Sequence, residues 1–395
     1  MHGPHDFTDE AFYASIRKPV ETGLSLDPVI YRSEAFHALE MERIWGRAWV
    51  CVGYTSQVAK TGDTIKGSVA GQPMFITRDQ QGQLRAFYNV CRHRGSLVVL
   101  EDGPRKQIRC PYHSWAYSLD GRLTNTPLFK FETPGTAPLC KEDHGLLPIR
   151  VETWGCFIFV NLDPDAMPLA EYLGDLPARY GNFPLDELVL VRRKHYEIGA
   201  DWKIVSENFL EFLHLPWVHP ELNTVTAVDI HYRNQGNGSY MSFCAGPLKQ
   251  GGTSIDADYL PAMPGLNEEE KKTGYFPQVF PNLALFLMPN NVFALQMHPV
   301  GPGRTAETGD LLVHPSLLAE EGVEAKIDEV FAFYDLVNVQ DVHAVQRVQA
   351  GMAVRVFKGG LYTWRYEEPL HRFQNMVADY MTGNPRVPGG DATGS

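Results

Sequence analysis

Two short stretches of the chain each place a cysteine beside a histidine. The first is Cys91-Arg-His93, and the second, after sixteen intervening residues, is Cys110-Pro-Tyr-His113. Thiolate sulfur and neutral imidazole nitrogen are side-chain ligands that soft and borderline transition metals prefer. The four side chains are therefore candidate ligands of a metal centre.

The order of these ligands separates two kinds of metal centre. In a Rieske centre, two cysteines hold one iron of a [2Fe–2S] cluster and two histidines hold the other. Two loops that each offer one cysteine and one histidine fit that division. A Cys₂His₂ zinc site uses the same residue types, but it usually pairs its cysteines in one loop and its histidines in another. The pattern favours the cluster over zinc.

The other four cysteines have no such neighbours, and they are interpreted as small apolar residues: Cys51, Cys140, Cys156 and Cys244. Six cysteines are too few for a disulfide scaffold in a chain of 395 residues.

A second group of metal-binding side chains lies between residues 201 and 219. The apolar spacing predicts a helix from about Trp202 to Leu215. On this helix Glu207, Glu211 and His214 would share the face opposite the apolar stripe.

Pro216 should end that helix, so that the chain turns and His219 approaches His214. Two imidazoles and one carboxylate, with the remaining positions open, form the facial triad of Fe(II) oxygenases. The carboxylate has to come from another part of the chain. A solvated helix face that ends in a chance histidine is the alternative interpretation.

A di-iron site is a further alternative, because Glu211-x-x-His214 is repeated as Glu368-x-x-His371. Such sites need long helices that point carboxylates into a bundle. Pro369 inside the second copy argues against that bundle.

The elements that must position these residues change character along the chain. A helix is expected near 33–45, short strands and turns fill 50–161, and a mixed α+β region with a long helix at 323–350 follows. At this length two domains are the better expectation.

Composition excludes several partners and compartments. Lysine plus arginine number 35 against 47 aspartate plus glutamate, a net charge of −12, so nucleic acid is not an expected partner. The N-terminal residues lack the pattern of a secretory signal, and no apolar run is long enough to span a membrane. A cytoplasmic protein is expected. No GxGxxG or P-loop motif is present for a dinucleotide or ATP.

The loops NVCRHRG and CPYHSW, together with the two iron-site histidines, resemble the Rieske non-haem iron oxygenase family, specifically its α or terminal oxygenase subunit. The resemblance assigns Cys91, His93, Cys110 and His113 to the [2Fe–2S] cluster, and it assigns His214 and His219 to the mononuclear iron.

The resemblance also implies the third iron ligand. In several members an aspartate lies eight residues before the glutamine of a Val-Gln-x-Gly stretch, and Asp341 has that place before Gln349. The residues alone leave Asp328 and Asp335, on the same expected helix, as open alternatives.

In the family, an acidic residue three positions before the first iron histidine bridges the iron site to a cluster histidine of the neighbouring subunit; here it is Glu211. This glutamate and the His219-Pro-Glu-Leu run resemble the quaternary-ammonium group, with its choline and carnitine monooxygenases and its glycine betaine and stachydrine demethylases. Asp201, where asparagine is common, is expected near the iron. Ser114 replaces a common glycine.

The fold that the resemblance implies is α+β: a Rieske all-β domain and a helix-grip (START-like) catalytic domain with an antiparallel sheet. The expected divisions are an N-terminal segment packing on the catalytic domain (1–45), the Rieske domain (46–163), the catalytic domain (164–382) and a flexible tail (383–395). A head-to-tail homotrimer is implied.

The implied activity is an O₂-dependent monooxygenation of a C–H bond, with electrons from NAD(P)H through a separate ferredoxin or flavin reductase component. Attack on an N-methyl group would amount to N-demethylation. Hydroxylation of an aromatic ring is one alternative, and an electron carrier with no second metal site is another. Six aromatic residues are candidates for a cation-binding pocket or for core: Phe209, Phe212, Trp217, Tyr232, Tyr240 and Phe243.

Overall fold

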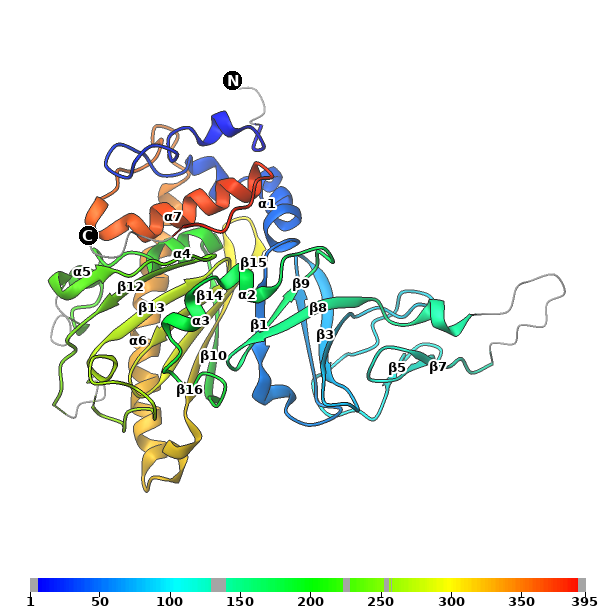
Figure 1. The fold of residues 1–395 in the computed structure, drawn as a ribbon. Helices are drawn as coiled ribbons and strands as arrows, with labels where there is room; N and C mark the ends of the chain where they lie inside the picture. Colours follow the sequence, from blue (N-terminus) through cyan, green and yellow to red (C-terminus); the bar gives the residue numbers. More distant parts are fainter. Residues whose placement is uncertain (1–5, 129–139, 223–227, 252–255, 257, 390–395) are drawn as a thin grey trace. The chain divides into compact units, whose positions relative to one another are not determined.

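The computed structural model describes residues 6–128, 140–222, 228–251, 256 and 258–389. The chain divides into two compact units (Figure 1). One unit comprises residues 45–166, and the other combines residues up to 44 with residues from 167 onward. The first unit is built on strands and has no α-helix among its described residues, and the second joins one large sheet to helices, so the α+β class is confirmed.

The smaller unit contains two antiparallel sheets, with strand orders β1-β9-β8-β4-β3-β2 and β5-β6-β7. Its strands are β1 (Val50–Tyr54), β2 (Thr64–Val69), β3 (Gln72–Arg78), β4 (Leu84–Tyr88), β5 (Ile108–Arg109), β6 (Ala116–Tyr117), β7 (Leu123–Asn125), β8 (Pro148–Trp154) and β9 (Phe157–Asn161).

Turns were expected between the short strands of this unit, and two of them close the β3–β4 and β6–β7 hairpins. The turn between β3 and β4 is closed by Asp79, whose carboxylate accepts the backbone N–H groups of Gln81 and Gln83. Between β6 and β7, Gly121 has φ +90°, and a Cβ atom there would lie 2.5 Å from the ring of Phe87. Glycine is therefore required by space as well as by conformation.

The larger unit is built on a seven-stranded antiparallel sheet of order β10-β16-β15-β14-β13-β12-β11. Its strands are β10 (Val189–Ile198), β11 (His231–Arg233), β12 (Tyr240–Ala245), β13 (Gly274–Val279), β14 (Leu283–Leu287), β15 (Val292–Gly301) and β16 (Arg304–Val313). Its α-helices are α1 (Glu34–Glu40), α2 (Leu169–Leu173), α3 (Leu176–Arg179), α4 (Trp202–Phe209), α5 (Leu215–Val218), α6 (Val323–Gly351) and α7 (Trp364–Met381).

The long helix α6, close to its predicted bounds, packs on this sheet. Tyr334 of α6 stacks on Phe293 of β15 with ring centroids 4.4 Å apart and planes 1° from parallel. Ile327, Val330 and Val337 are buried along the same side of the helix. This packing brings the C-terminal half of α6 alongside α4.

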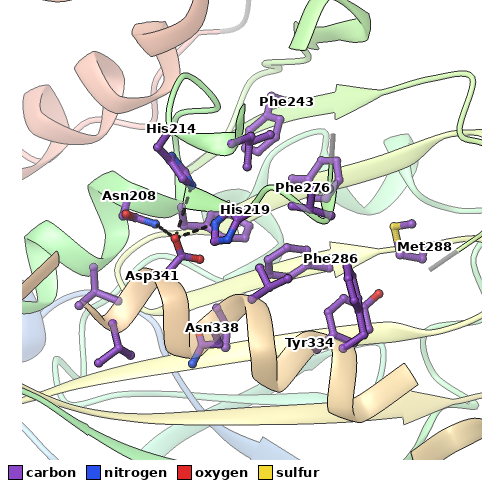
Figure 2. Close-up of a pocket in the computed structure, with 18 of the residues that line it drawn as sticks. Asn208, His214, His219, Phe243, Phe276, Phe286, Met288, Tyr334, Asn338 and Asp341 are labelled. Carbon is purple, nitrogen blue, oxygen red and sulfur yellow. Dashed lines mark hydrogen bonds and ion pairs between the residues drawn. The ribbon is translucent and has the colours of Figure 1, made fainter. Parts of the chain in front are cut away.

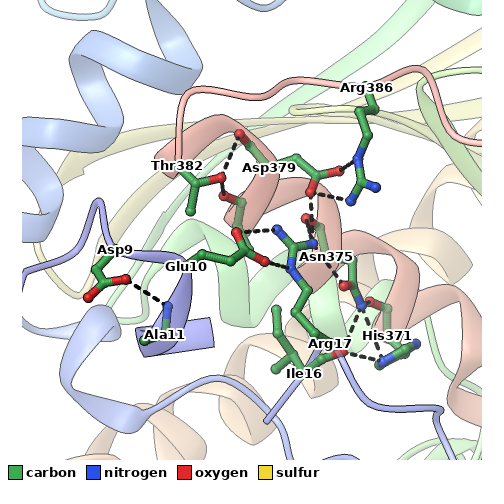
Figure 3. Close-up of polar contacts among 11 residues, drawn as sticks. Asp9, Glu10, Ala11, Ile16, Arg17, His371, Asn375, Asp379, Thr382 and Arg386 are labelled. Carbon is green, nitrogen blue, oxygen red and sulfur yellow. Dashed lines mark hydrogen bonds and ion pairs between the residues drawn. The ribbon is translucent and has the colours of Figure 1, made fainter. Parts of the chain in front are cut away.

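The N-terminal segment belongs to the larger unit. Ser33 caps α1 as expected, because its side chain accepts the N–H of Phe36. Farther upstream, Arg17 pairs with Glu10 and also reaches Asp379 of α7 at 2.7 Å (Figure 3). The Arg17–Asp379 pair attaches the segment to α7.

Strand β10, at the edge of the sheet, and helix α7 are among the elements of this unit that were not predicted. Helix α7 contains Pro369, which the sequence interpretation took as evidence against a bundle of long helices. The proline lies in the second turn of α7, and buried Leu370, Phe373 and Val377 anchor the rest. Tertiary burial thus outweighs the local cost of the proline.

The residues after α7 are also bonded to this unit as far as they are described. Arg386 pairs with Asp379, and the carbonyl of Pro388 accepts the N–H of Gly238. The last part of the expected tail, 390–395, lies outside the described residues. No helix in the described part of the chain has the length and apolar character needed to cross a membrane.

Candidate metal centres

The helix predicted over 202–215 is interrupted before it reaches His214. Helix α4 ends at Phe209. Beyond it, the Glu211 carboxylate accepts the backbone N–H groups of Leu213, at 2.5 Å, and His214, at 3.3 Å. A side chain that takes these N–H groups competes with helical hydrogen bonds, which explains the early end of the helix.

A second, one-turn helix then spaces the two histidines. His214 is the N-cap of α5 and His219 its C-cap, so Pro216 lies in the first turn of a helix and does not terminate one. The turn brings the two imidazole ring centroids to 5.2 Å from each other. The approach of His219 to His214 is as expected, although the local structure that produces it is different.

Asp341 of α6 completes a group of three ligands (Figure 2). Its Oδ1 atom lies 3.0 Å from Nε2 of His219 and 3.4 Å from Nε2 of His214. The ligand atoms of the three residues all lie within 4.8 Å of one another. Asn208 of α4 donates to the same Oδ1 at 2.8 Å.

The two other aspartates considered on this helix are engaged elsewhere. Asp328 pairs with Arg192, and Asp335 pairs with Lys194 and accepts the hydroxyl of Tyr196. Only Asp341 among the three faces the histidines.

Each histidine is oriented by a hydrogen bond on its Nδ1 atom. Nδ1 of His214 lies 2.5 Å from Oε1 of Glu211, and Nδ1 of His219 lies 2.7 Å from Oε1 of Gln340. Gln340 in turn donates to Glu221 at 3.1 Å. Both Nε2 atoms face Asp341, and a histidine whose Nδ1–H donates to such an oxygen has its Nε2 lone pair available for a metal, the arrangement that metal-ligating histidines adopt.

The electrostatics of this site favour a bound cation. Burial opposes a charge on His214, but the hydrogen bond and charge of Glu211 outweigh it and, with Asp341, raise the pKa of the imidazole. Two imidazoles, one carboxylate and an open pocket beside them fit an iron of the facial-triad type. Sequence reasoning missed Asn208 and Gln340, because an amide on a helix has no distinctive spacing.

Two other acidic positions, Asp201 and Glu207, do not reach the iron-site candidates. Asp201 caps α4 and forms a buried ion pair with Lys203 at 2.7 Å, so the structure does not bring it to the iron site. Glu207 accepts hydrogen bonds from Tyr31 and Gln374 and does not share a face with His214. Its expected place beside Glu211 is therefore wrong.

The second Glu-x-x-His copy also lies apart from the first. Glu368 accepts a hydrogen bond from Gln235, and His371 bonds to the carbonyl of Ile16. Within the described residues, His214, His219 and Asp341 form the one group of three metal-binding side chains that lie close enough to hold a single ion. The di-iron alternative is excluded.

In the smaller unit, the four cluster candidates form a cysteine pair and a histidine pair. Cys91 and Cys110 are 2% and 1% exposed, and their thiols interact with each other. The rings of His93 and His113 have centroids 4.6 Å apart. This separation by residue type matches the division of ligands between the two irons of a Rieske cluster.

The same geometry argues against zinc. Ligand atoms on one tetrahedral zinc lie about 4 Å apart or less, given metal–ligand distances of 2.0–2.3 Å. In the part of the chain that the structure describes, the group of three side chains placed to hold one ion is His214, His219 and Asp341, and the four cluster candidates do not form such a group. Their separation into a cysteine pair and a histidine pair fits a two-iron cluster better than a single zinc ion.

Neighbouring groups support the cluster loops. Burial raises the pKa of the Cys110 thiol, but the backbone N–H groups of His113 and Tyr112 outweigh it and lower the pKa overall. Trp115 stacks on His93 with centroids 4.8 Å apart. Ser114 has φ +57°, a left-handed conformation that explains why glycine is common there and that costs serine about 1–2 kcal/mol.

A cavity of about 140 Å³ opens beside the three iron-site ligands. Its lining is mainly apolar and includes Phe209 and Phe243 of the six aromatic candidates. Trp217 and Tyr232 are 86% and 48% exposed, and Tyr240 is buried in the core.

Comparison with known families shows which family the chain belongs to. Residues 185–383 match the ring hydroxylating alpha subunit (catalytic domain) family, and residues 48–133 match the Rieske [2Fe-2S] domain. The chain belongs to the ring-hydroxylating alpha-subunit family. As such an alpha subunit, it is an oxidoreductase with a Rieske cluster, a mononuclear iron and O₂ as co-substrate. A pure electron carrier is excluded, because the alpha-subunit catalytic domain is present.

Relatives of this alpha subunit include a chloroplastic choline monooxygenase of Atriplex hortensis, 26% identical over 90% of this chain and 77% of that protein. The glycine betaine monooxygenase oxygenase subunit of Chromohalobacter salexigens is 27% identical over 90% of this chain and 86% of its own length.

Solved structures share the fold of the alpha subunit. The quaternary ammonium Rieske monooxygenase CntA in complex with L-carnitine has a TM-score of 0.76 at 24% identity, over 94% of this chain and 99% of its own. Naphthalene 1,2-dioxygenase from Rhodococcus sp. has a TM-score of 0.78 at 23% identity, over 94% of this chain and 98% of its own. Substrates as different as a betaine and a fused aromatic ring are handled by this fold, so the fold does not choose between them.

Proposed function

We propose that this alpha subunit monooxygenates a C–H bond of a methylated ammonium compound. The observation that carries the proposal is the pocket that opens directly on His214, His219 and Asp341 and is lined by aromatic side chains. A cationic methyl group held by aromatic faces would lie next to the iron. The choline and glycine betaine monooxygenases among the relatives support this substrate class.

When bound, the iron supplies O₂ activation and the cluster supplies electrons one at a time. His214, His219 and Asp341 would hold the iron, and the pocket beside them would admit O₂ and substrate. Glu211 and Gln340 keep the two rings in the orientation that binds metal. The mainly apolar lining would disfavour water beside the iron.

The proposed net reaction inserts one oxygen atom of O₂ into a C–H bond, and the other leaves as water with two electrons and two protons. If the bond belongs to an N-methyl group, the carbinolamine breaks its C–N bond and releases formaldehyde. The electrons come from NAD(P)H through a separate reductase component, since the sequence contains no nucleotide-binding motif.

Glu211 is proposed to link the two metal centres between subunits of a head-to-tail homotrimer. Its Oε1 atom contacts His214, and in this arrangement the carboxylate would also meet His93 or His113 of the next subunit. The related CntA structure is described in terms of inter-subunit electron transfer, which supports this assignment.

Hydroxylation of an aromatic ring is the second candidate. A biphenyl 2,3-dioxygenase subunit alpha of Rhodococcus jostii is 38% identical over 190 residues, 47% of this chain and 40% of that protein. The aromatic lining of the pocket would also suit a hydrocarbon ring.

Substrate-dependent O₂ uptake with formaldehyde release separates the two candidates. With a suitable reductase and NADH, methylated ammonium compounds should stimulate O₂ consumption, and formaldehyde should appear if the attacked bond belongs to an N-methyl group. Turnover of aromatic compounds, with no response to any methylamine, would contradict the proposed substrate class while leaving the oxygenase assignment intact.

A further inference from the structure

The pocket beside the iron site carries an excess of negative charge. Four carboxylates line it, those of Glu211, Asp256, Glu307 and Asp341. No lysine or arginine occurs among its described lining residues, and the segments 223–227 and 252–257 contain none in the sequence. Asp341 and Glu211 serve the metal site, which leaves two carboxylates without a role in oxygen chemistry.

Glu307 of β16 is the better defined of the two. It is 2% exposed, and its Oε1 atom accepts a hydrogen bond from Asn338 at 2.7 Å. Its Oε2 atom is buried without a hydrogen-bond partner among the described residues. Asn338 precedes Asp341 by one turn of α6, a rise of about 5 Å. The carboxylate therefore lies at the end of the pocket where the reaction occurs.

A buried carboxylate in this setting is costly unless a positive group joins it. Burial raises the pKa of Glu307 to about 7, and the nearby charge of Asp341 adds to the effect. A cationic ligand would supply the missing partner and favour the ionised form.

Another part of the pocket lining is a cluster of aromatic rings that includes Phe243, Phe276 and Phe286 (Figure 2). Phe243 and Phe276 stack with centroids 4.8 Å apart, and Phe286 meets Phe276 edge-on at 5.6 Å. Phe276, Phe286 and Met288 are only half-buried and line the pocket. Aromatic faces attract methylated ammonium groups without requiring a hydrogen-bond donor.

We propose that the pocket selects a methylated ammonium cation that bears no carboxylate, with Glu307 as its counter-charge and the aromatic cluster around its methyl groups. This inference rests on the proposed function and narrows it. A betaine or an aromatic acid would bring a second negative charge to a lining with no ammonium or guanidinium group. His231, the one other lining imidazole among the described residues, stacks with Phe212 and Phe276.

The test measures binding without turnover. Full-length, iron-loaded protein, kept anaerobic and without reductase, is titrated calorimetrically with choline, its neutral isostere 3,3-dimethyl-1-butanol, and glycine betaine. Choline should bind about tenfold or more tightly than either of the others, because only choline combines the cation with no carboxylate.

Glu307→Gln keeps the shape and the hydrogen bond with Asn338 but removes the charge. It should weaken choline binding by about tenfold and leave the isostere unchanged. Glu197→Gln is the matched control, because Glu197 is exposed on the neighbouring strand β10. This variant should change neither the affinity for choline nor the affinity for the isostere. Unchanged cluster absorbance and thermal unfolding will show that each variant is folded.

The inference is overturned if glycine betaine or the isostere binds as tightly as choline, if no probe binds, or if Glu307→Gln leaves choline affinity unchanged. Choline binding of the expected strength without choline-dependent O₂ uptake would uphold the selectivity of the pocket and count against the proposed reaction instead. The two ideas therefore fail in distinguishable ways.

Discussion

The side-chain oxygen of Gln340 lies 2.7 Å from Nδ1 of His219, while the adjacent Asp341 faces Nε2 of the same ring at 3.0 Å. Two consecutive residues of α6 thus hold one imidazole from two sides. Gln340 fixes the tautomer and orientation that leave Nε2 available to the metal.

Replacing Gln340 with leucine should therefore weaken iron binding. We expect a loss of about 10- to 100-fold in Fe(II) affinity, the usual effect of removing a hydrogen bond to a ligand histidine. Titration of Fe(II) into chelator-treated protein measures it, with cluster absorbance as the integrity check. Gln340→Glu keeps an acceptor and should recover part of the affinity; equal affinities in all three proteins would show that Gln340 has no positioning role.

Asp341→Ala should abolish product formation and remove the mononuclear iron, because it deletes the carboxylate of the ligand group. The matched control is Asp335→Ala on the same helix, which breaks a partly exposed pair with Lys194 and should retain iron and most activity. Metal analysis and product assays check both. Iron retained by the Asp341 variant but lost by the Asp335 variant would reverse the assignment.

Glu211→Gln should leave a folded, iron-loaded protein with turnover reduced by orders of magnitude, because the charge that contacts His214 is lost while the shape remains. Glu211→Asp should keep partial activity. Single-turnover oxidation of the pre-reduced cluster, with substrate and O₂ present, is the decisive measurement. A Gln variant as fast as the parent would show that the proposed electron bridge does not exist.

Cys110→Ala should bleach the protein and remove the EPR signal of the reduced cluster. Iron should fall from about three atoms per chain to about one, since a two-iron cluster is lost and the mononuclear site remains. Cys140→Ala is the control, because Cys140 is exposed outside both sites and should change neither colour nor iron content. A colourless parent protein with stoichiometric zinc would refute the cluster.

The buried Lys203 offers a test of stability apart from catalysis. Its ammonium group is fully buried between Glu40, at 2.6 Å, and Asp201, at 2.7 Å. Lys203→Ala would leave both carboxylates buried without their cation, so we expect a loss of about 3–5 kcal/mol in the free energy of unfolding. Lys194→Ala, which breaks a more exposed pair, should cost less than about 1 kcal/mol. Denaturant titration compares them, and equal losses would contradict the argument.

Much of the candidate site could be predicted from the short spacing of its residues in the sequence. Cys91 with His93, Cys110 with His113, and His214 with His219 each lie within one loop or one turn, so the order of residue types was enough to propose two metal centres. The hairpin turns and the long helix α6 were likewise predictable, because turn residues and apolar periodicity act over a few residues.

Contacts between distant segments were decided only by the tertiary structure. Asp341 is 122 residues from His219, and its choice over Asp328 and Asp335 depends on which side of α6 faces α5. Helix α4 stops at Phe209 because the Glu211 side chain bonds to backbone N–H groups, an interaction that periodicity does not register.

The pocket is the part of the site that could least be predicted from the sequence. Glu307, Asn338 and the ring of Phe276 come from β16, α6 and β13, and nothing in their local sequence marks them as neighbours. The residue types at each metal centre can therefore be recognised in the sequence, because a metal requires particular ligand atoms and several of the ligands lie close together along the chain. The charge and shape that choose a substrate arise only when the sheet and α6 pack together and place distant side chains around one cavity.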